Sequence, residues 1–307
     1  MKVFALVALC LIPAAYSQVK VAHNGDRIAV EIDGQPFGEL VTGADAWKPY
    51  FYPLRSASGK VVTRAFPMDT TVAGEPHDHN HHRGLWFAHI DVNGTDFWGS
   101  DPLNKPAKNY GKIVLTKVNS VKSGKKSGSL SASFNWNDPT GKTLLTEDRT
   151  MTFHSDPKLR IVDLDIVLTP KEKVHFGDDK DGTFGVRLAQ PLQEDKGTGK
   201  ITNADGLAGE KQVWGKPSNW ADYSGTLDGE QLGVAIFDHP GNPRFPTHWH
   251  ARAYGLFSAN PFGQKTFDKT QPEGGESFEA GKPFLFRYRV IVHPAGTDLA
   301  GLYSKWK

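Results

Sequence analysis

Apolar and polar residues alternate with a period of two along most of this chain. The clearest run is residues 130–136, in which Leu, Ala, Phe and Trp take every second position between Ser and Asn. Such alternation places successive side chains on opposite faces of a β-strand, so that one face is buried and the other faces solvent. The pattern predicts strands, flanked by Gly, Pro, Asn or Asp, at residues 27–32, 112–118, 129–136, 144–153, 159–168, 184–189, 232–237 and 284–292.

A helical pattern occurs only near the end of the sequence, at residues 298–306. Asp298 can accept hydrogen bonds from the first turn, and Leu299 and Leu302 would pack against the rest of the protein. Many strands with one short helix predict an all-β protein, built as a large antiparallel β-sandwich. No internal repeat or linker divides the chain. Residues 18–307 are therefore expected to form a single domain, with residues 193–231 as a long surface excursion.

The first 17 residues have the features of a secretory signal peptide. Lys2 precedes an apolar run at residues 3–15, which is shorter than the roughly 20 residues that a membrane span needs. Residues 15–17 are Ala-Tyr-Ser, which fits the small-residue pattern of a cleavage site. The one cysteine, Cys10, lies in this segment, so the mature protein would have no disulfide. We expect export to the bacterial periplasm or the exterior, without a lipid anchor.

The charge balance argues against nucleic acid or an anionic membrane as a partner. The chain has 36 Lys and Arg against 34 Asp and Glu, which gives a formal net charge of +2. Such a weak balance produces no strong positive field. No later apolar run is long enough to span a bilayer. The eight tryptophans indicate instead a surface on which a ligand's rings can stack.

A histidine cluster in residues 75–98 is the most unusual local feature. Four of the six residues at 77–82 are histidine, with Asp78 among them and Arg83 directly after. An isolated histidine in a loop is usually only a solvated polar residue. Four of them beside a guanidinium, which binds carboxylates and sugar oxygens, favour a functional site.

Two chemistries are open to this cluster. If the segment were extended, His77, His79 and His81 would point to one side and could hold a divalent metal. Gly74 and Pro76 favour irregular backbone instead, in which the imidazoles transfer protons and form hydrogen bonds. We predict a site that needs no cofactor, with the metal site as the alternative.

A second loop of similar composition follows the predicted strand at residues 232–237. Its prolines fix its path, which lowers the entropy cost of holding polar side chains in place. We predict that this loop and the histidine cluster form one pocket. The candidate residues of the second loop are His239, Asn242, His248, His250 and Arg252.

Strands and a later segment supply further candidates. Glu147 is interpreted as out of phase with its apolar neighbours, and is either a general base or a partner of Arg149. Arg187 lies in an apolar strand, where an inward guanidinium needs a partner or a ligand. Trp220 and Asp222 would add an aromatic face and a carboxylate, which are the groups that polyol recognition uses.

The histidine cluster also carries a family resemblance. Residues 78–88, Asp-His-Asn-His-His-Arg-Gly-Leu-Trp-Phe-Ala, resemble the D-H-x-H-H-R-G-L-W segment of the PmoA-like family of bacterial proteins. Segments at residues 91–94, 96–98, 181–187, 220–225, 239–243 with Trp249, and 260–263 also look similar to that family. Such proteins are often exported and found among sugar-degradation genes, so the resemblance implies a carbohydrate substrate. The size and strand pattern are similar to the galactose-mutarotase supersandwich, in which His, Arg and a carboxylate act on sugars.

These features predict an exported carbohydrate-active enzyme, either a glycoside hydrolase or a lyase. Histidines would transfer protons, and arginines would bind oxygen atoms and stabilise developing negative charge. A His-rich metalloenzyme and a carbohydrate-binding protein without catalysis are the alternatives. The predicted catalytic residues are His81, His82, Arg83, Glu147 and His239. The predicted substrate-binding residues are Asp78, His79, Arg187, Trp220, Asp222, Asn242, His248, His250 and Arg252.

Overall fold

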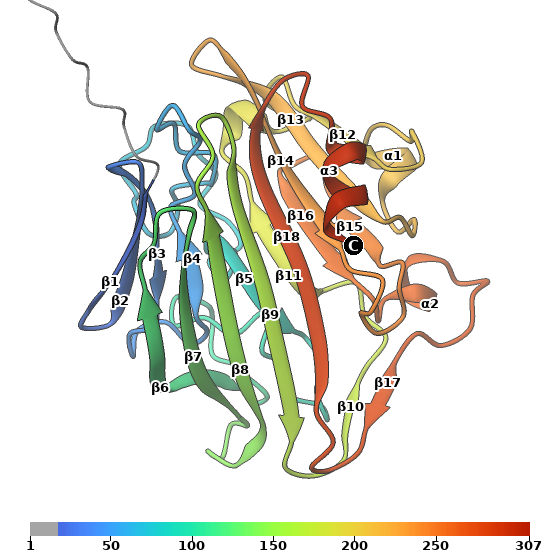
Figure 1. The fold of residues 1–307 in the computed structure, drawn as a ribbon. Coiled ribbons are helices and arrows are strands. Elements are labelled where there is room, and N and C mark those ends of the chain that lie inside the picture. The colour runs from blue at the N-terminus through green and yellow to red at the C-terminus, as the bar shows by residue number, and fades with distance from the viewer. Residues whose placement is uncertain (1–17) are drawn as a thin grey trace, which may run out of the picture.

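Two antiparallel sheets of eight strands each face one another (Figure 1). The computed structural model describes residues 18–307, so the predicted signal peptide lies outside the described residues. The first sheet has the order β1 (Val19–Asn24), β2 (Arg27–Ile32), β3 (Gln35–Val41), β4 (Tyr50–Tyr52), β5 (Leu85–His89), β11 (Gly182–Arg187), β16 (Leu256–Asn260) and β15 (His248–Ala251). The second sheet has the order β12 (Lys200–Asn203), β13 (Trp220–Leu227), β14 (Glu230–Asp238), β18 (Phe284–Pro294), β9 (Arg160–Pro170), β8 (Thr143–His154), β7 (Ser127–Asn137) and β6 (Lys112–Lys122).

A small two-stranded sheet and four short helical segments complete the fold. The small sheet pairs β10 (Val174–Phe176) with β17 (Glu276–Phe278). The helices are η1 (Gln190–Leu192), α1 (Glu210–Val213), α2 (Gln264–Phe267) and α3 (Leu299–Trp306). The predicted all-β sandwich with a short C-terminal helix is confirmed, and every run with period-two alternation overlaps an observed strand.

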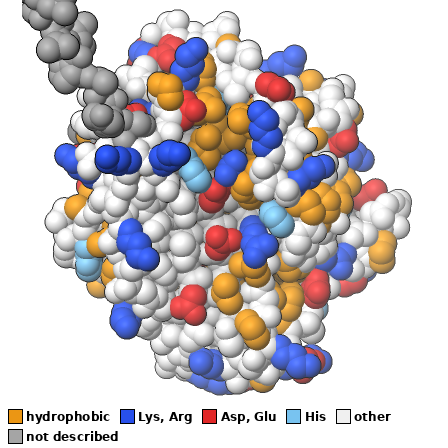
Figure 2. All heavy atoms as spheres, in the orientation of Figure 1, with side chains coloured by type: hydrophobic (Ala, Val, Ile, Leu, Met, Phe, Trp, Pro, Cys, Tyr) orange, Lys and Arg blue, Asp and Glu red, His pale blue; other side chains and the backbone are white. Residues whose placement is uncertain are grey.

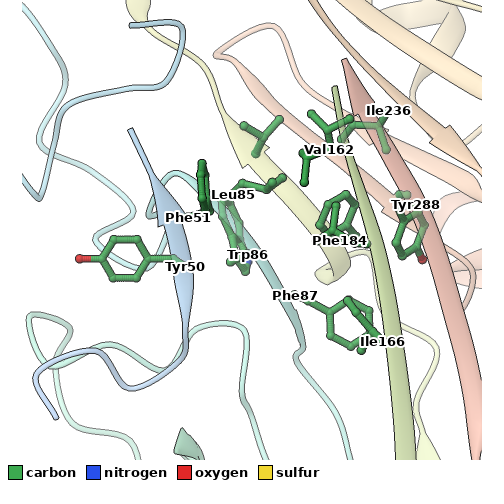
Figure 3. Packing of buried hydrophobic residues seen from close by; sticks show 14 of the residues in the cluster. Tyr50, Phe51, Leu85, Trp86, Phe87, Val162, Ile166, Phe184, Ile236 and Tyr288 are labelled. Carbon is green, nitrogen blue, oxygen red and sulfur yellow. The ribbon is translucent and has the colours of Figure 1, made fainter. Parts of the chain in front are cut away.

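The main core lies between the two sheets, because the inward residues of both are apolar. In β7 every second residue is buried. Phe87 of β5 meets Trp136 of β7 with ring centroids 5.9 Å apart, and Phe184 of β11 stacks on Tyr288 of β18 at 4.6 Å. Figure 3 shows these inward side chains of the first sheet, whereas Tyr50 of β4 points the opposite way. Residues that alternate with Phe87 and Phe184 therefore lie on the outer face of the first sheet.

Glu147 lies in this core, which corrects the interpretation of its strand. In β8 the buried phase includes Leu145, Glu147 and Arg149, so Glu147 is in phase with the apolar residues. Its carboxylate accepts hydrogen bonds from Arg149 Nε at 2.6 Å and from Trp136 Nε1 at 2.8 Å. The exposed fractions of the two charged side chains are 0% for Glu147 and 3% for Arg149. The sequence suggested the opposite phase because Leu144, which lies just before, is buried as well.

The outer face of the second sheet is partly covered by the C-terminal helix. Asp298 caps α3 by accepting a hydrogen bond from Gly301 N at 2.9 Å, as predicted. Leu299 and Tyr303 of the helix pack in an apolar cluster with Phe237 of β14. Elsewhere on the face in view, charged side chains of both signs are scattered rather than gathered (Figure 2).

The segment at residues 193–231 is more regular than the sequence predicted. It contains β12, α1 and β13, and the two strands extend the second sheet beyond β14. The expected long surface excursion is therefore wrong, because the Gly-rich stretches are turns between short elements. No helix within residues 18–307 is long and apolar enough to cross a membrane.

Candidate functional site

A row of side chains crosses the outer face of the first sheet on five neighbouring strands. Each member of the row alternates with residues of the core, so the row faces away from the second sheet. Arg187 lies on the same face of β11, two residues after Gly185, which belongs to the row. The pairing of β4, β5, β11, β16 and β15 sets side by side Tyr50, Trp86, Gly185, Ser258 and His250.

Residues 75–83 fold over this row as an irregular loop. His82 stacks on Trp86 with ring centroids 5.1 Å apart, and Trp98 packs against the same indole at 5.0 Å. Gly185 makes this close packing possible, since a Cβ atom at that position would come within 2.9 Å of the Trp98 ring. The aromatic side chains thus hold the loop to the sheet.

Asp78 of this loop binds two buried guanidinium groups that come from outside the loop. Its Oδ1 accepts hydrogen bonds from Arg64 Nη1 at 2.6 Å and from Arg187 Nη2 at 3.4 Å. Neither arginine side chain is exposed, whereas 45% of the Asp78 side chain is exposed. Partial burial raises the pKa of Asp78, but Arg187, His79 and Arg64 together outweigh this effect and lower it. Asp78 is therefore an ionised, fixed carboxylate at neutral pH.

His79 lies beside this carboxylate at the exposed rim of the loop. Its Nδ1 is 3.1 Å from Asp78 Oδ2, and 40% of its side chain is exposed. The carboxylate beside Nδ1 favours a proton on that nitrogen, which leaves the Nε2 lone pair of the neutral ring as a proton acceptor. The ring stacks with His82 at 4.8 Å and with Tyr254 at 5.4 Å. These two stacking contacts hold the His79 ring in position.

Tyr254 approaches the same rim from the loop between β15 and β16. The guanidinium of Arg187 lies 4.5 Å from the centre of its ring, and that of Arg252 lies 5.3 Å away. Arg252 Nε donates to Glu210 Oε1 at 2.9 Å, which anchors this loop. Burial raises the pKa of Tyr254, so the phenol keeps its proton at neutral pH. A proton donor and a proton acceptor therefore stand at one rim.

Three further imidazoles of the site are held in the neutral form. Burial, helped by the charge of Lys48, lowers the pKa of His81 to about 2. Burial likewise lowers the pKa of His250 to about 3. His82 is fully buried, its pKa is far below the ordinary value, and its Nδ1 lies 3.1 Å from Arg187 Nη1. His82 thus positions the arginine rather than contacting a ligand.

A supporting loop, residues 96–104, forms hydrogen bonds with the histidine loop. Asn104 Nδ2 lies 3.3 Å from His81 Nδ1. Asp101 accepts two hydrogen bonds from Arg83, at 2.5 and 2.9 Å. Since this pairing uses both carboxylate oxygens and buries most of the guanidinium, Arg83 fastens the two loops together.

Lys48 and Asp96 lie close enough for their charges to interact, and both have perturbed pKa values. Burial lowers the pKa of Lys48 to about 7. Its ammonium donates to the carbonyl oxygens of Trp98 and Ser100, both at 2.8 Å. Burial raises the pKa of Asp96 to about 6. Two groups beneath the loops therefore change their charge near neutral pH.

His250 forms the other end of the row, beside Asp181. Its Nδ1 lies 3.6 Å from Asp181 Oδ1, which is too long for a hydrogen bond. Within the described chain, both ring nitrogens of His250 are buried without a hydrogen-bond partner, as are the indole nitrogens of Trp86 and Trp98. Unpaired buried polar atoms cost free energy, so they mark positions where ligand or solvent atoms would bind.

The structure brings eight of the predicted site residues into this one region. They are Asp78, His79, His81, His82, Arg83, Arg187, His250 and Arg252. The sequence analysis missed six neighbours, which are Lys48, Arg64, Asp96, Asp101, Asp181 and Tyr254. Only Asp96 and Asp181 lay in segments that the family resemblance had already singled out.

The expectation that residues 239–252 and the histidine cluster all form one pocket is wrong. His239 lies on the outer face of the second sheet, with its ring 5.3 Å from that of Trp306. Asn242 fastens its own loop by donating to Asp238 Oδ1 at 2.7 Å and to Arg287 O at 2.8 Å. The chain crosses from β14 of the second sheet to β15 of the first between these residues and the site. Only the last part of residues 239–252 therefore reaches the histidine loop.

Four other predicted residues also lie outside this site. Trp220 and Asp222 belong to β13 of the second sheet, where Trp220 packs against the apolar cluster under α3. Asp222 Oδ1 lies 3.0 Å from His293 Nε2. Glu147 is enclosed in the core. His248 is on the outer face of the first sheet but lines a separate cavity.

The three-histidine metal site is not assembled. His77 stacks on Phe66 with ring centroids 4.4 Å apart, and the rings of His79 and His81 are 5.8 Å apart. His79 has a φ of 45°, which breaks the extended alternation that a common direction requires. Among residues 18–307, no group of three or more His, Cys, Asp or Glu side chains is arranged to hold a metal ion.

Comparison with known proteins supplies a family and similar folds. The family model of DUF6807, a family of unknown function, matches residues 27–307. A search of curated proteins finds no match. The resemblance to the PmoA-like family stays a prediction.

Several solved structures of sugar-related proteins are similar at low sequence identity. The GH36 α-galactosidase AgaA from Geobacillus stearothermophilus has a TM-score of 0.46 and 10% identity over 90% of this chain and 40% of that one, so this chain spans about 40% of its length. A galactose mutarotase-like protein from Clostridium acetobutylicum has a TM-score of 0.42 and 10% identity over 90% of this chain and 98% of that one. A putative aldose 1-epimerase from Escherichia coli K12 has a TM-score of 0.33 and 12% identity over 90% and 99%.

Proposed function

This chain belongs to the DUF6807 family, and because that family has no known function, we propose one from the outer face of the first sheet. We propose that the protein is a carbohydrate-active enzyme, and specifically a lyase that cleaves an acidic polysaccharide by β-elimination. The observation that carries this proposal is the His79–Asp78 pair, fixed at an exposed rim next to Tyr254. The side chains at this rim can supply both the base and the acid that such a reaction needs.

The proposed reaction removes one proton from a carbon atom of the substrate and adds one proton to the leaving oxygen. His79 Nε2 takes the proton from the carbon atom next to the substrate's carboxylate, and Asp78 stabilises the imidazolium that forms. The electron pair of that C–H bond becomes part of a C=C bond, as the bond from the next carbon to the glycosidic oxygen breaks. Tyr254 gives its phenolic proton to the departing oxygen. The products are an unsaturated uronide and a chain end with a free hydroxyl, and the step uses no cofactor.

The positive charge near the rim suits an acidic substrate. The guanidinium groups of Arg64 and Arg187 lie under the rim and share the carboxylate of Asp78, and the charges of Glu75 and Asp195 also act on them. Arg252 lies beside Tyr254, and one-third of its side chain is exposed. Negative charge that develops on the substrate's carboxylate during proton removal would be stabilised by these groups.

Lyase chemistry is favoured over glycoside hydrolysis by the state of the carboxylates. Hydrolysis generally needs a carboxylic acid to protonate the leaving oxygen and a second carboxylate across the bond. Asp78 is held ionised by two arginines. Asp96 has a raised pKa, but it is buried and accepts a hydrogen bond from Gly99 N at 2.7 Å. The exposed rim therefore offers histidine and tyrosine rather than a carboxyl pair.

The proposal is tested by incubating purified protein with a panel of acidic and neutral polysaccharides. We expect unsaturated products, detected by ultraviolet absorbance and mass spectrometry, from an acidic polysaccharide only. H79Q should lower kcat about 100- to 10,000-fold, as removal of a general base does, with little change in thermal unfolding. H239Q is the matched control, since His239 lies on the other sheet, and it should keep full activity.

Each other outcome identifies a different function. Saturated products that contain an added water molecule would replace the lyase with a glycoside hydrolase. Sugar binding without turnover would make the protein a carbohydrate-binding module. Activity that disappears with a chelator and returns with a divalent metal would support the metalloenzyme alternative. Failure to bind or convert any carbohydrate would overturn the proposal.

A further inference from the structure

An open cavity of about 550 Å³ lies on the outer face of the first sheet, outside the site described above. Its lining includes His248 of β15, which lies two residues before His250 on the same face of the strand. Alternate residues of a strand are about 7 Å apart. The ring of Phe267 stands between them, 6.1 Å from the ring of His248 and 5.9 Å from that of His250. The cavity is therefore the immediate neighbour of the row that ends at His250.

The walls of the cavity are held by backbone and side-chain hydrogen bonds. On one side, Lys216 O accepts a hydrogen bond from Trp249 N of β15 at 3.2 Å, which keeps Lys216 beside the strand. On the other side, Arg244 donates from Nε to Pro261 O at 3.1 Å and from Nη2 to Gln264 Oε1 at 2.7 Å. Lys216 and Arg244 thus come from separate segments. Hydrogen bonds hold Lys216 beside β15 and Arg244 beside the loop that follows β16.

The cavity has an excess of positive charge. The hydrogen-bond acceptors of Arg244 are both neutral, and it forms no salt bridge with any residue of the described chain. Asp268 is the one acidic residue in the lining, and its carboxylate already accepts hydrogen bonds from Thr270. His248 is kept neutral, because burial and the charge of Arg244 lower its pKa. Its Nδ1 is buried without a partner within residues 18–307.

We infer that this cavity binds a second anionic group, such as a carboxylate or sulfate, more than one sugar unit away from the reacting unit. The charges of Lys216 and Arg244 attract the anion, and the unpartnered imidazole of His248 adds a neutral hydrogen-bonding group. The sugar identity rests on the proposed function, whereas the anion binding does not. The inference makes the preferred substrate an acidic chain of at least two charged units rather than a single uronide.

Anion binding is tested with inorganic sulfate, followed by the NMR signals of the His248 ring in the full-length protein. We expect a saturable shift in the wild type, at least fivefold weaker binding in K216Q and in R244Q, and wild-type binding in K269Q. Lys216 is exposed, so K216Q is expected to fold even if R244Q loosens α2. Lys269 is an exposed lysine outside the cavity lining and serves as the matched control. No saturable shift, or equal affinity in K216Q and the wild type, would overturn the inference.

The position of the cavity along a substrate chain is tested by chain length. For an acidic tetrasaccharide, K216Q should raise KM about tenfold and leave kcat unchanged. For an acidic disaccharide, which fills only the reacting position and its neighbour, the change in KM should be smaller. Equal effects on both lengths would contradict the assigned position. Sulfate binding at His248 in a protein that converts no carbohydrate would leave the anion site standing and defeat the proposed function alone.

Discussion

At the scale of single residues, the surroundings of a carboxylate decide whether it serves a site or the core. Asp78 and Glu147 both bind buried arginines. Asp78 keeps almost half of its side chain exposed and orients His79, so its charge acts at the surface. Glu147 is wholly enclosed between the sheets, where its charge balances that of Arg149. Burying a charge is costly unless it is paired, so the role of Glu147 is to neutralise Arg149.

We predict that E147Q lowers stability rather than catalysis. Loss of the carboxylate leaves the buried guanidinium of Arg149 uncompensated, which typically costs about 3–5 kcal/mol in the free energy of unfolding. Urea unfolding of E147Q measures this loss. The double variant E147L/R149M removes both charges and should recover most of the stability, since a buried ion pair is often replaceable by apolar residues. An E147Q protein of native stability with kcat reduced a hundredfold would return Glu147 to the catalytic role.

Individual site residues could be predicted only where chemistry and motif coincided. His79, His81 and their neighbours stand in a dense histidine cluster, so the sequence singled them out. Lys48 and Tyr254 reach the same site from distant parts of the chain and stand in no motif. Their importance comes from burial and from contacts with Arg187 and the loop carbonyls, which are properties of the fold.

At the scale of elements, alternation predicted the strands that have one buried face. β7 and β9 show this pattern clearly. β16 lies in the first sheet, and all of its residues are buried, so it lacks alternation. The crossover from β14 to β15 was also hidden, because the intervening Pro-rich loop could have stayed beside either sheet. That crossover is the reason why His239 and His250 lie apart.

A second element-scale feature is an ion pair that spans a strand. Asp222 of β13 and His293 of β18 meet across β14, which lies between them. Gly233 of β14 allows this, because a Cβ atom there would lie 2.5 Å from His293 Nε2. The other ring nitrogen of His293 lies 2.9 Å from Pro294 O. Each ring nitrogen therefore has an acceptor, which favours the imidazolium form. Burial lowers the pKa of His293, but the effect of Asp222 is larger than that of burial, so the pKa is raised.

This pair predicts a stability contribution that decreases in alkali. A histidine whose folded-state pKa is above its unfolded value of about 6.5 stabilises the fold fully below that value. The contribution is lost as pH rises through the raised folded-state pKa. H293Q should therefore reduce the free energy of unfolding by roughly 1.5–3 kcal/mol at pH 6, and by less at pH 9.

Denaturant unfolding of H293Q and the wild type across this pH range measures the effect. H154Q is the matched control, because His154 and Asp163 form a similar but more exposed pair on the same sheet, with Nε2 and Oδ2 2.7 Å apart. Surface pairs contribute little, so H154Q should change stability by less than about 1 kcal/mol. A loss in H293Q that is constant from pH 6 to pH 9 would contradict the assignment.

At the scale of the whole molecule, the two outer faces of the sandwich have different coverings. Loops at residues 75–83 and 96–104 cover the first sheet and bring polar groups over it. The second sheet is covered by α3 and by scattered charges (Figure 2). Period-two alternation predicts a sandwich but treats the two outer faces alike. The location of the site therefore follows from the loops, whose paths depend on contacts between distant residues.

The number of histidines held neutral by burial predicts that the whole protein loses stability in mild acid. An imidazole whose folded-state pKa is below the unfolded value of about 6.5 binds its proton more readily in the unfolded state. Its contribution to stability is complete above pH 6.5 and is lost as pH falls toward the folded-state pKa. Burial lowers the pKa of His81, His82, His89, His239, His248 and His250.

Two carboxyl groups and His293, whose pKa values are raised, oppose this effect but are outnumbered. Burial raises the pKa of Asp96 to about 6 and that of Asp238 to about 7, so the folded state takes up a proton at each of them as pH falls. We therefore expect the free energy of unfolding to fall between pH 7 and pH 5, before ordinary carboxylates are protonated. In H250Q the fall should be shallower, by up to about 1.4 kcal/mol per pH unit. H77Q, which replaces an exposed imidazole, should follow the wild type. Stability that is constant or rises from pH 7 to pH 5, or equal slopes in H250Q and the wild type, would show that these histidines do not control the fold's response to acid.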